Sequence, residues 1–304
     1  MASGYTVSAL TNYVNVNKDT LIKDVVLGYK IGDTISKMAK QLGVKETEKL
    51  NYLNVDPVLQ AGKGCGFNAS GDTAFSERDI TAKILKVNDQ WCPDALIGKY
   101  AEYLVKLGAN KNADNMPFEE EIMNEIQIKL AQKLEKMVWQ GDTGLSFTGL
   151  IGLAEGADSA STSAVTLSSA ATIYANIKSM VMAIPEEILD DAVIFVSPAN
   201  YRSFIQEMVE KNYYHYESGK IENDDFIFPG TNIAVHKTLG MTGVNDKIYA
   251  STYKNLVYAC DMLDDKEEFR LWFSDDDDVF KLKIKFNAGC STYFPDMVVL
   301  GTIA

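Results

Sequence analysis

The sequence PFEEEIMNEIQIKLAQKLEKMVWQGDTGLSFTGLIGL, from Pro117 to Leu153, is the stretch from which the fold can be inferred. Its first part predicts a single long helix from Pro117 to Trp139. Proline suits the first turn, and the three glutamates that follow complement the positive end of the helix dipole. Gly141 ends the helix. At 1.5 Å per residue the helix is roughly 35 Å long, about the width of a small domain. A glycine-punctuated apolar segment follows it.

Apolar residues recur at every fourth position along this predicted helix. Each step of four residues turns the apolar stripe by about 40°, so the stripe winds about half way round the helix. A winding stripe predicts different neighbours at the two ends, as for a spine that crosses a domain. An ordinary amphipathic core helix remains the alternative. The stripe consists of Phe118, Ile122, Ile126, Leu130, Leu134 and Val138.

The composition limits the function classes. The chain has 304 residues, 46% of them hydrophobic, which suits one large domain or two modest ones. Its 29 basic and 42 acidic residues give a net charge of −13. Direct nucleic-acid binding relies on an excess of Lys and Arg, so this acidic chain is not expected to bind nucleic acid. An acidic inner surface would still suit a container that encloses its contents without binding them. No apolar run is long enough to span a membrane. The four widely spaced cysteines indicate reduced thiols.

The first hundred residues predict an arm, a helix and a long excursion. Helical spacing predicts a helix over Lys30–Gly43. Asn51–Asn68 is glycine-rich and poor in helix formers, and Thr73–Val87 shows the alternation of a strand. Excursions this long are usually functional or disordered, and the aromatic and β-forming residues here favour an ordered, interacting loop with a returning strand.

The second half predicts alternating helices and strands. We expect a surface loop over Ala154–Ser169, then a helix, a buried strand over Ala192–Val196 and a second helix that starts at Ser197-Pro198. Near the C-terminus, apolar residues alternate with lysines over Val279–Ala288. That pattern is typical of a half-exposed strand with a basic outer face.

The motifs that could carry chemistry fail in their details. The cluster Gly62-Lys63-Gly64-Cys65-Gly66 lacks the spacing of a phosphate-binding loop, and glycines that permit an unusual backbone path explain it better. The run Asp275–Asp278 lacks the glycine and the bidentate glutamate of a calcium loop, so we interpret it as a solvated turn between two strands.

No catalytic constellation emerges. The two histidines, His215 and His236, lie on separate segments without the context of a zinc site, and no nucleophile signature is present. We therefore predict no catalytic, cofactor-binding or metal-binding residue and no enzyme activity. The charged set Glu77-Arg78-Asp79 has two interpretations that the sequence leaves open: an exposed strand edge, or an ion-pair site between subunits.

The order of these segments resembles the major capsid proteins of tailed bacteriophages of the Hong Kong 97 type. Similar features are the arm, the glycine-bearing loop that returns through Phe75–Ile80, the long helix that ends at Trp139-Gln140-Gly141, and the segment Phe147–Gly152. Val193–Tyr201 resembles that family's strand and helix in the axial domain. Phe228–Thr231 and Pro295–Val299 resemble the following loop and the closing strand. The resemblance covers nearly the whole chain through soft motifs in the right order.

The resemblance implies an α+β fold with an axial domain, a peripheral domain that carries the spine helix, an extended β loop and an N-terminal arm. The implied boundaries are 1–48 for the arm, 49–90 for the loop, 91–153 for the peripheral domain, 154–260 for the axial domain and 261–304 for returning strands. Some members of the family are cross-linked between Lys and Asn, and here Lys63 is only a loose candidate. The predicted inter-subunit contacts are Gly62, Lys63, Gly64, Phe75, Glu77 and Arg78.

The implied function is a structural one. Copies of the chain would form hexamers and pentamers of an icosahedral shell that encloses double-stranded DNA without reading its sequence. The expected partners are other copies and scaffolding, portal and decoration proteins, with no membrane and no cofactor. The expected location is the virion capsid, assembled in the cytoplasm of the host bacterium. The alternatives are the shell of an encapsulin-like compartment on the same fold and an unrelated α/β enzyme.

Overall fold

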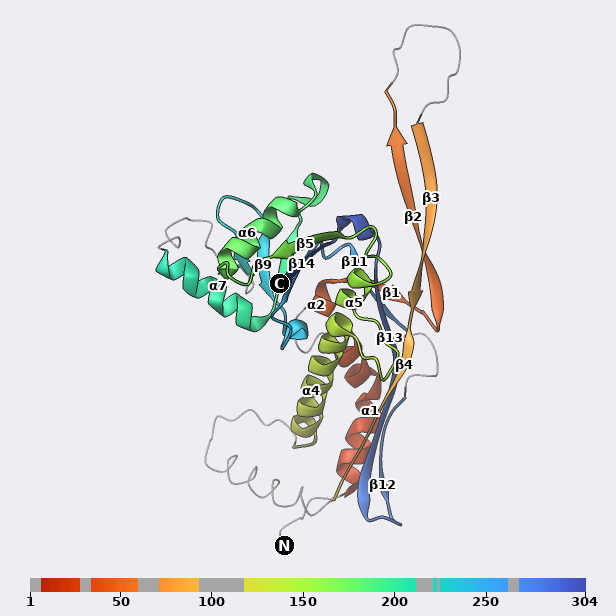
Figure 1. Cartoon of the computed structure of the whole chain (residues 1–304). Coiled ribbons are helices and arrows are strands. Elements are labelled where there is room, and N and C mark those ends of the chain that lie inside the picture. The colour runs from red at the N-terminus through yellow and green to blue at the C-terminus, as the bar shows by residue number, and fades with distance from the viewer. Residues whose placement is uncertain are drawn as a thin grey trace, which may run out of the picture.

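The computed structural model describes residues 7–27, 34–59, 71–92, 118–211, 221–222, 225–261 and 268–304. Two sheets, one of five strands and one of seven, meet at the C-terminal end of the long helix α4. A separate two-stranded hairpin projects from the body (Figure 1). The chain is thus a mixed α and β structure, as the sequence predicts.

Helix α4 (Phe118–Gln140) is the predicted spine helix, and it contacts different elements at its two ends, as the winding stripe predicts. Its N-terminal half packs on α1 (Val7–Val26), where Met123 is buried and the Gln127 amide donates to the Leu21 carbonyl at 2.9 Å. Its C-terminal half contacts the short helices η3 (Leu239–Met241) and α5 (Leu150–Glu155). The winding stripe therefore reports two successive sets of neighbours.

The five-stranded sheet covers α1 and α4. Its order is β1-β11-β13-β12, with β4 (Lys83–Trp91) paired to the other edge of β13. In β13 (Val279–Thr292), the apolar residues from Phe280 to Phe286 are buried and the alternating lysines are half-exposed, which confirms the predicted strand. The remaining strands are β1 (Ala39–Leu42), β11 (Leu256–Cys260) and β12 (Glu268–Ser274).

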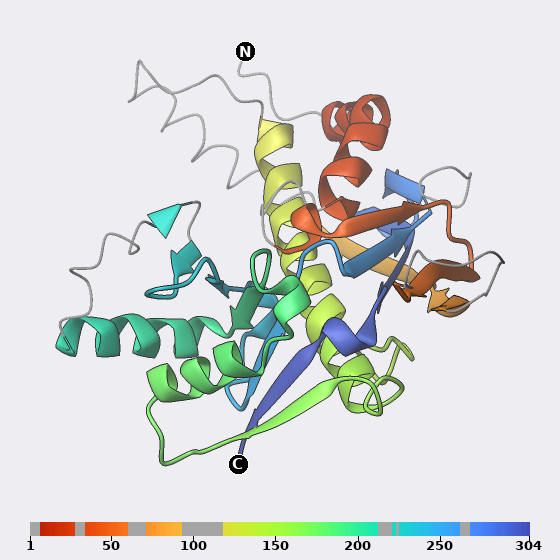
Figure 2. The same ribbon diagram turned by 90° about the horizontal axis from the view of Figure 1, so that it is seen from above.

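The central strands of the seven-stranded sheet are buried on both faces. Phe195 in β6 and Tyr249 in β10 face the end of α4, whereas Ile194 and Val196 face the helices α6 (Ile173–Ala183) and α7 (Pro198–Glu210), which lie side by side (Figure 2). The strand order is β5 (Ser163–Leu167), β14 (Val299–Ile303), β10 (Lys247–Ser251), β6 (Val193–Val196), β9 (Ala234–Lys237), β8 (Asp225–Ile227) and β7 (Ile221–Glu222).

The predicted strand and helix around Ser197 are confirmed. The Ser197 hydroxyl accepts a hydrogen bond from the Asn200 backbone N–H at 3.2 Å, and Pro198 occupies the first turn of α7. A serine cap followed by proline is a local signal, so it could be identified without knowledge of the tertiary structure.

Two predictions of secondary structure are wrong. In the described part of the segment Lys30–Gly43, residues 34–43, the helix α2 covers only Thr34–Lys37, and the strand β1, which pairs in parallel with β11, follows it. The segment Ala154–Ser169 contains β5, which pairs in parallel with β14. In both cases a short segment completes the edge of a sheet, and the pairing partner lies more than 100 residues away, so tertiary pairing overrides the local pattern.

Candidate assembly elements

The hairpin of β2 (Thr47–Pro57) and β3 (Gly71–Thr81) projects from the body of the molecule (Figure 1). The two strands of 11 residues pair along their whole length, from Thr47 opposite Thr81 to Pro57 opposite Gly71. Within the described residues no third strand joins this sheet. Just beyond β2, Val58 is 52% exposed and Leu59 is 99% exposed. The hairpin therefore presents strand edges, and the residues just beyond β2 present apolar side chains, that another chain can cover.

Two ion pairs fix the base of the hairpin. Arg78 forms an ion pair with Asp158, and the two side chains are only 14% and 10% exposed. The Arg78 Nε also donates to the Ser291 hydroxyl at 3.1 Å. Glu77 pairs across the hairpin with Lys49, and this ion pair is well exposed. The hydrogen bond that Lys49 donates to the Glu77 carboxylate raises the pKa of Lys49. Arg78 therefore attaches the hairpin to the body, whereas Glu77 strengthens the hairpin itself.

The predicted contact residues divide into three groups. Gly62, Lys63 and Gly64 lie outside the described residues. Phe75 lies in β3, with its backbone opposite Leu53. Glu77 and Arg78 have the partners within the chain that were just described, so a protruding loop does not leave them without intrachain contacts. Their role between subunits stays a prediction.

A buried carboxylate joins three segments at the end of α4. Glu135 Oε1 accepts hydrogen bonds from the Trp139 indole and the Thr238 hydroxyl, both at 3.2 Å. Its Oε2 accepts from the Ile35 backbone N–H at 3.3 Å. The Thr34 hydroxyl adds a hydrogen bond of 3.1 Å to Thr238. Sequence reasoning identified Trp139 but missed Glu135, although an acidic residue four positions before a buried tryptophan is one helical turn from the indole N–H.

Close backbone contacts hold the chain that leaves α4. Gly141 has a φ of +75°, and a Cβ atom on Gly149 would lie 2.3 Å from the Gly141 nitrogen. The turn therefore folds directly against the end of the helix. The Gln140 amide donates to the carbonyls of Gly240 and Thr242 at 2.7 and 3.0 Å. These contacts explain why the predicted break after Gln140 needs glycines, because any side chain at Gly149 would collide with backbone.

No group of three His, Cys, Asp or Glu residues among the described residues could hold a metal ion. His236 is buried in β9 with its ring 5.8 Å from that of Phe195, and His215 lies outside the described ranges. Burial raises the pKa of the Cys290 thiol to about 12, so this cysteine is not an activated nucleophile.

The acidic run Asp275–Asp278 is a turn between β12 and β13, as predicted. Asp277 forms an ion pair with Lys281, and its carboxylate also accepts a hydrogen bond from the Ser274 hydroxyl at 3.2 Å. The hydrogen bond from Lys281 lowers the pKa of Asp277. This carboxylate is thus committed to the turn.

Among the described helices, none is long and apolar enough to cross a membrane.

Comparison with known proteins identifies the fold. No protein-family model and no curated protein matches the sequence. The solved structure of the satellite phage P4 procapsid is similar, with a TM-score of 0.60 and 10% identity over 99% of this chain and 93% of that chain. The structure from Mycobacterium phage Bobi is similar too, with a TM-score of 0.54 and 12% identity over 89% of this chain and 90% of that chain. The SrpI encapsulin of Synechococcus elongatus has a TM-score of 0.55 and 8% identity over 87% of this chain and 84% of that chain. The chain therefore has the capsid-protein fold of tailed bacteriophages, which this encapsulin shares.

Proposed function

We propose that this protein is the major capsid protein of a tailed bacteriophage with a double-stranded DNA genome. Copies of the chain assemble into hexamers and pentamers, and these build an icosahedral shell. The supporting observation is the combination of a capsid-protein fold over almost the whole chain with a hairpin that extends away from its own body (Figure 1). A lone two-stranded hairpin is marginally stable in water, so contact with a second copy is the natural way to cover it.

The proposed shell follows the Hong Kong 97 arrangement. In this proposal residues 1–48 form the arm, 49–90 the extended loop, 91–153 the peripheral domain, 154–260 the axial domain and 261–304 the returning strands. The Hong Kong 97 resemblance and the phage capsid neighbours support this division. The predicted contacts at Gly62, Lys63, Gly64, Phe75, Glu77 and Arg78 belong to the loop and would face neighbouring copies.

The proposed contents and partners follow from charge and from the shell itself. A net charge of −13 keeps packaged DNA enclosed without tight binding to the wall. Scaffolding, portal and decoration proteins are the proposed partners, assembly occurs in the cytoplasm of the host bacterium, and the product is the virion capsid. The proposed role is structural and involves neither catalysis nor a membrane.

Assembly of the purified chain tests the proposal. We expect light scattering and negative-stain microscopy to show capsomers or closed shells when the chain is concentrated, or when it is expressed with the neighbouring genes of its phage. A chain that stays monomeric under all these conditions, while circular dichroism shows it folded, would overturn the proposal.

An encapsulin-like compartment is the second candidate, and the similarity to the SrpI encapsulin supports it. The contents of the particles distinguish the two. Nuclease-protected DNA inside particles from the native host favours a phage capsid, whereas one co-purified protein enclosed in every particle favours a compartment. A ligand-dependent catalytic activity of the soluble chain would instead support the α/β enzyme.

A further inference from the structure

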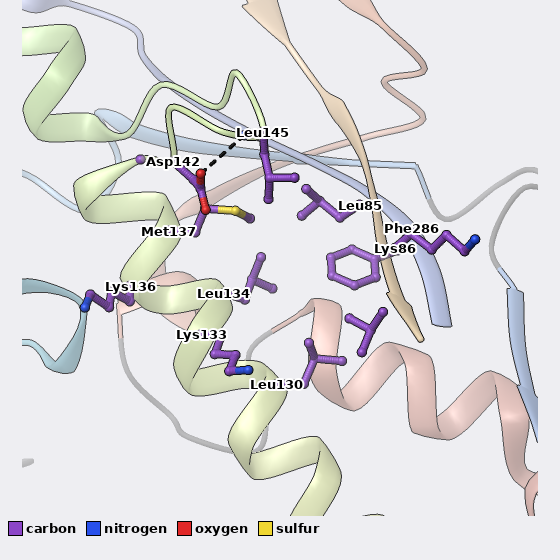
Figure 3. Close-up of a pocket in the computed structure, with 12 residues that line it drawn as sticks. Leu85, Lys86, Leu130, Lys133, Leu134, Lys136, Met137, Asp142, Leu145 and Phe286 are labelled. Carbon is purple, nitrogen blue, oxygen red and sulfur yellow. Dashed lines mark hydrogen bonds between the residues drawn. The ribbon is translucent and has the colours of Figure 1, made fainter. Parts of the chain in front are cut away.

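The five-stranded sheet has one face against the helices α1 and α4 and one face turned away from them. Leu85 and Phe286 line an apolar pocket of about 380 Å³ beside α4, and the Lys86 side chain points away from this pocket (Figure 3). Successive residues of a strand point to opposite faces, so the lysines that alternate with the buried residues of β13 share the face of Lys86. We call this face the basic face; its cationic residues are Lys86, Arg270, Lys281, Lys283 and Lys285.

The basic face brings like charges together. Lys285 lies directly opposite Lys86 on β4, and Lys283 lies directly opposite Arg270 on β12. Like charges directly opposite each other on neighbouring strands destabilise a sheet. Only one acidic residue, Glu268 of β12, has a position directly opposite one of the lysines of β13. An anion supplied from outside the chain would relieve the repulsion that the sheet retains.

A depression of about 540 Å³ lies on the basic face. Its acidic lining residue, Asp89, already accepts a hydrogen bond from the backbone N–H of Gln90 at 2.8 Å. The Arg270 guanidinium lies over the ring of Trp272, another lining residue, 5.2 Å from its centroid. Lined mainly by hydrogen-bond donors, the depression suits carboxylate or phosphate oxygens. The lining residues with donor groups in their side chains include Lys86, Asn88, Gln90, Lys281 and Lys283.

The size of the basic face favours a short acidic segment over a nucleic acid. At about 3.4 Å per residue and about 4.8 Å between strands, Lys281 to Lys285 span about 14 Å, and the three strands are about 10 Å wide. The phosphates of a DNA duplex continue along its axis beyond this area. At one end of β13 they would meet the exposed run Asp275–Asp278, which repels them. A few carboxylates on a turn fit the area without this repulsion.

The same chain presents a short acidic segment of this kind. The turn Asp275–Asp278 joins β12 to β13 at the end of the sheet that lies away from the seven-stranded sheet (Figure 1). Asp277 pairs with Lys281 of its own chain. The other three aspartates of the turn are exposed, and no hydrogen bond or ion pair joins their carboxylates to another residue in the described part of the chain. The turn therefore keeps three carboxylates for a partner.

We propose that the turn Asp275–Asp278 of one copy docks on the basic face of a second copy. This inference rests on the proposed shell function and names one contact within the shell. The turn and the basic face are different surfaces, so the contact is heterologous, and such contacts generate closed rings or continuing lattices, as a shell requires. Every copy carries a net charge of −13, so a local attraction of opposite charges helps the copies to approach each other.

Charge exchange tests the contact. In the face variant Lys86→Glu/Lys285→Glu, glutamates meet the carboxylates of the turn, and we expect the yield of assembled particles to fall about tenfold because like charges repel at the contact. The yield of the turn variant Asp275→Lys/Asp276→Lys is expected to fall similarly. A chain with all four substitutions restores opposite charges and is expected to recover most of the yield. Light scattering and negative-stain microscopy measure the yield, and circular dichroism melts verify that each variant is folded.

Two controls match these changes of net charge at exposed residues elsewhere. Lys18→Glu/Lys129→Glu matches the face variant, and Glu186→Lys/Glu187→Lys matches the turn variant. Both controls are expected to assemble like the wild type. If they lose as much yield as the test variants, net charge alone governs assembly and the inference is wrong.

The remaining outcomes separate this inference from the proposed function. If the wild type assembles and the face variant assembles equally well, the docking is wrong while the shell function stands. If the face and turn variants fail and the fourfold variant does not recover, the two surfaces bind other partners and the docking is also wrong. A labelled DNA duplex that the wild type retains in a gel shift and the face variant does not, with assembly unchanged, would make the basic face a nucleic-acid surface instead. A wild type that never assembles contradicts the shell function itself, and the contact falls with it.

Discussion

Trp139 and Gly240 lie in direct contact at the point where the two sheets meet. A Cβ atom on Gly240 would lie 2.0 Å from Cδ1 of the Trp139 indole and 2.8 Å from the Glu135 carbonyl oxygen. The indole is fully buried and packs on Phe195 and Tyr249, with ring centroids 4.9 and 5.3 Å away. The ring therefore has no free space into which it could move.

We predict opposite effects for two glycine substitutions. Gly240→Ala forces the packed indole to shift and is expected to destabilise the protein by about 1–3 kcal/mol. Gly152 lies inside helix α5, and Gly152→Ala places its methyl group 3.4 Å from the methyl of Thr148, which precedes the helix. This is an ordinary contact, so the substitution is expected to stabilise by about 0.5–1 kcal/mol. Urea unfolding of both variants measures the difference. Equal effects of the two substitutions would contradict this account of the Trp139 contact.

The Cys290 thiol predicts a loss of stability at high pH. Its folded pKa of about 12 lies above the ordinary value of 9.0, so the folded thiol keeps a proton that the unfolded chain releases above pH 9. This contribution is fully present below pH 9 and is lost as the pH rises toward 12. Between pH 8 and pH 10 the loss is about 1.4 kcal/mol. Over the same pH interval, we expect the free energy of unfolding of Cys290→Ala, measured with urea, to fall by about 1.4 kcal/mol less than that of the wild type. Equal losses in the two proteins would contradict the raised pKa of Cys290.

At the scale of elements, shortening the hairpin tests whether it is needed for assembly but not for folding. Tyr52 lies opposite Ser76, so these two residues can be joined by Asn-Gly in place of residues 53–75. The shortened hairpin keeps the Lys49–Glu77 and Arg78–Asp158 ion pairs. We expect the variant to melt within a few degrees of the wild type, because the cores are untouched, and to form no shells in negative-stain images.

The matched control for the shortened hairpin is Arg78→Ala. It leaves the hairpin at full length but removes the partner of a nearly buried carboxylate, and breaking such a pair typically costs about 3–5 kcal/mol. The control is therefore expected to lower the melting temperature, in contrast to the shortened variant. Normal shells from the shortened chain would show that the hairpin is dispensable for assembly.

Elements with strong local signals could be predicted from the sequence. Helix α4 has its charges, its stripe and Gly141, and β13 has strict alternation, so both were predicted within a few residues. Strands β1 and β5 were missed because four or five residues of weak pattern become strands only through distant partners. Asp158 was missed for the same reason, because its partner Arg78 is 80 residues away in the sequence. Glu135 lies one helical turn from Trp139, but its bonds to Ile35 and Thr238 follow only from the tertiary structure.

At the scale of the whole molecule, the seven-stranded sheet couples two cores. Alternate residues of β6 enter opposite cores: Phe195 packs with Trp139, whereas Ile194 packs with Ile177 from α6. Trp139 lies in the first core and Trp91 packs against it, while Trp272 lies in β12 of the sheet that borders this core. Because β6 packs into both cores, unfolding of either core would remove packing contacts from the other.

We therefore predict a single unfolding transition. Ile177→Ala, in the second core, is expected to destabilise by about 2–5 kcal/mol and to shift the midpoint of tryptophan fluorescence as much as the midpoint of far-UV circular dichroism. A shift in circular dichroism with an unchanged fluorescence midpoint would show that the cores unfold separately. Exposed Met182→Ala on the same helix is the control and is expected to shift neither midpoint.

The hairpin has a consequence for the life of the subunit before it meets a partner. Its strands pair with no others in the described chain, and Leu59 beyond β2 is almost fully exposed to water. Such edges pair indiscriminately with any extended chain nearby. In the proposed shell, newly made subunits therefore accumulate safely only while orderly growth consumes them faster than random encounters do. Under this proposal the timing of synthesis, as much as the affinity of contacts, determines whether the chain yields particles or precipitate.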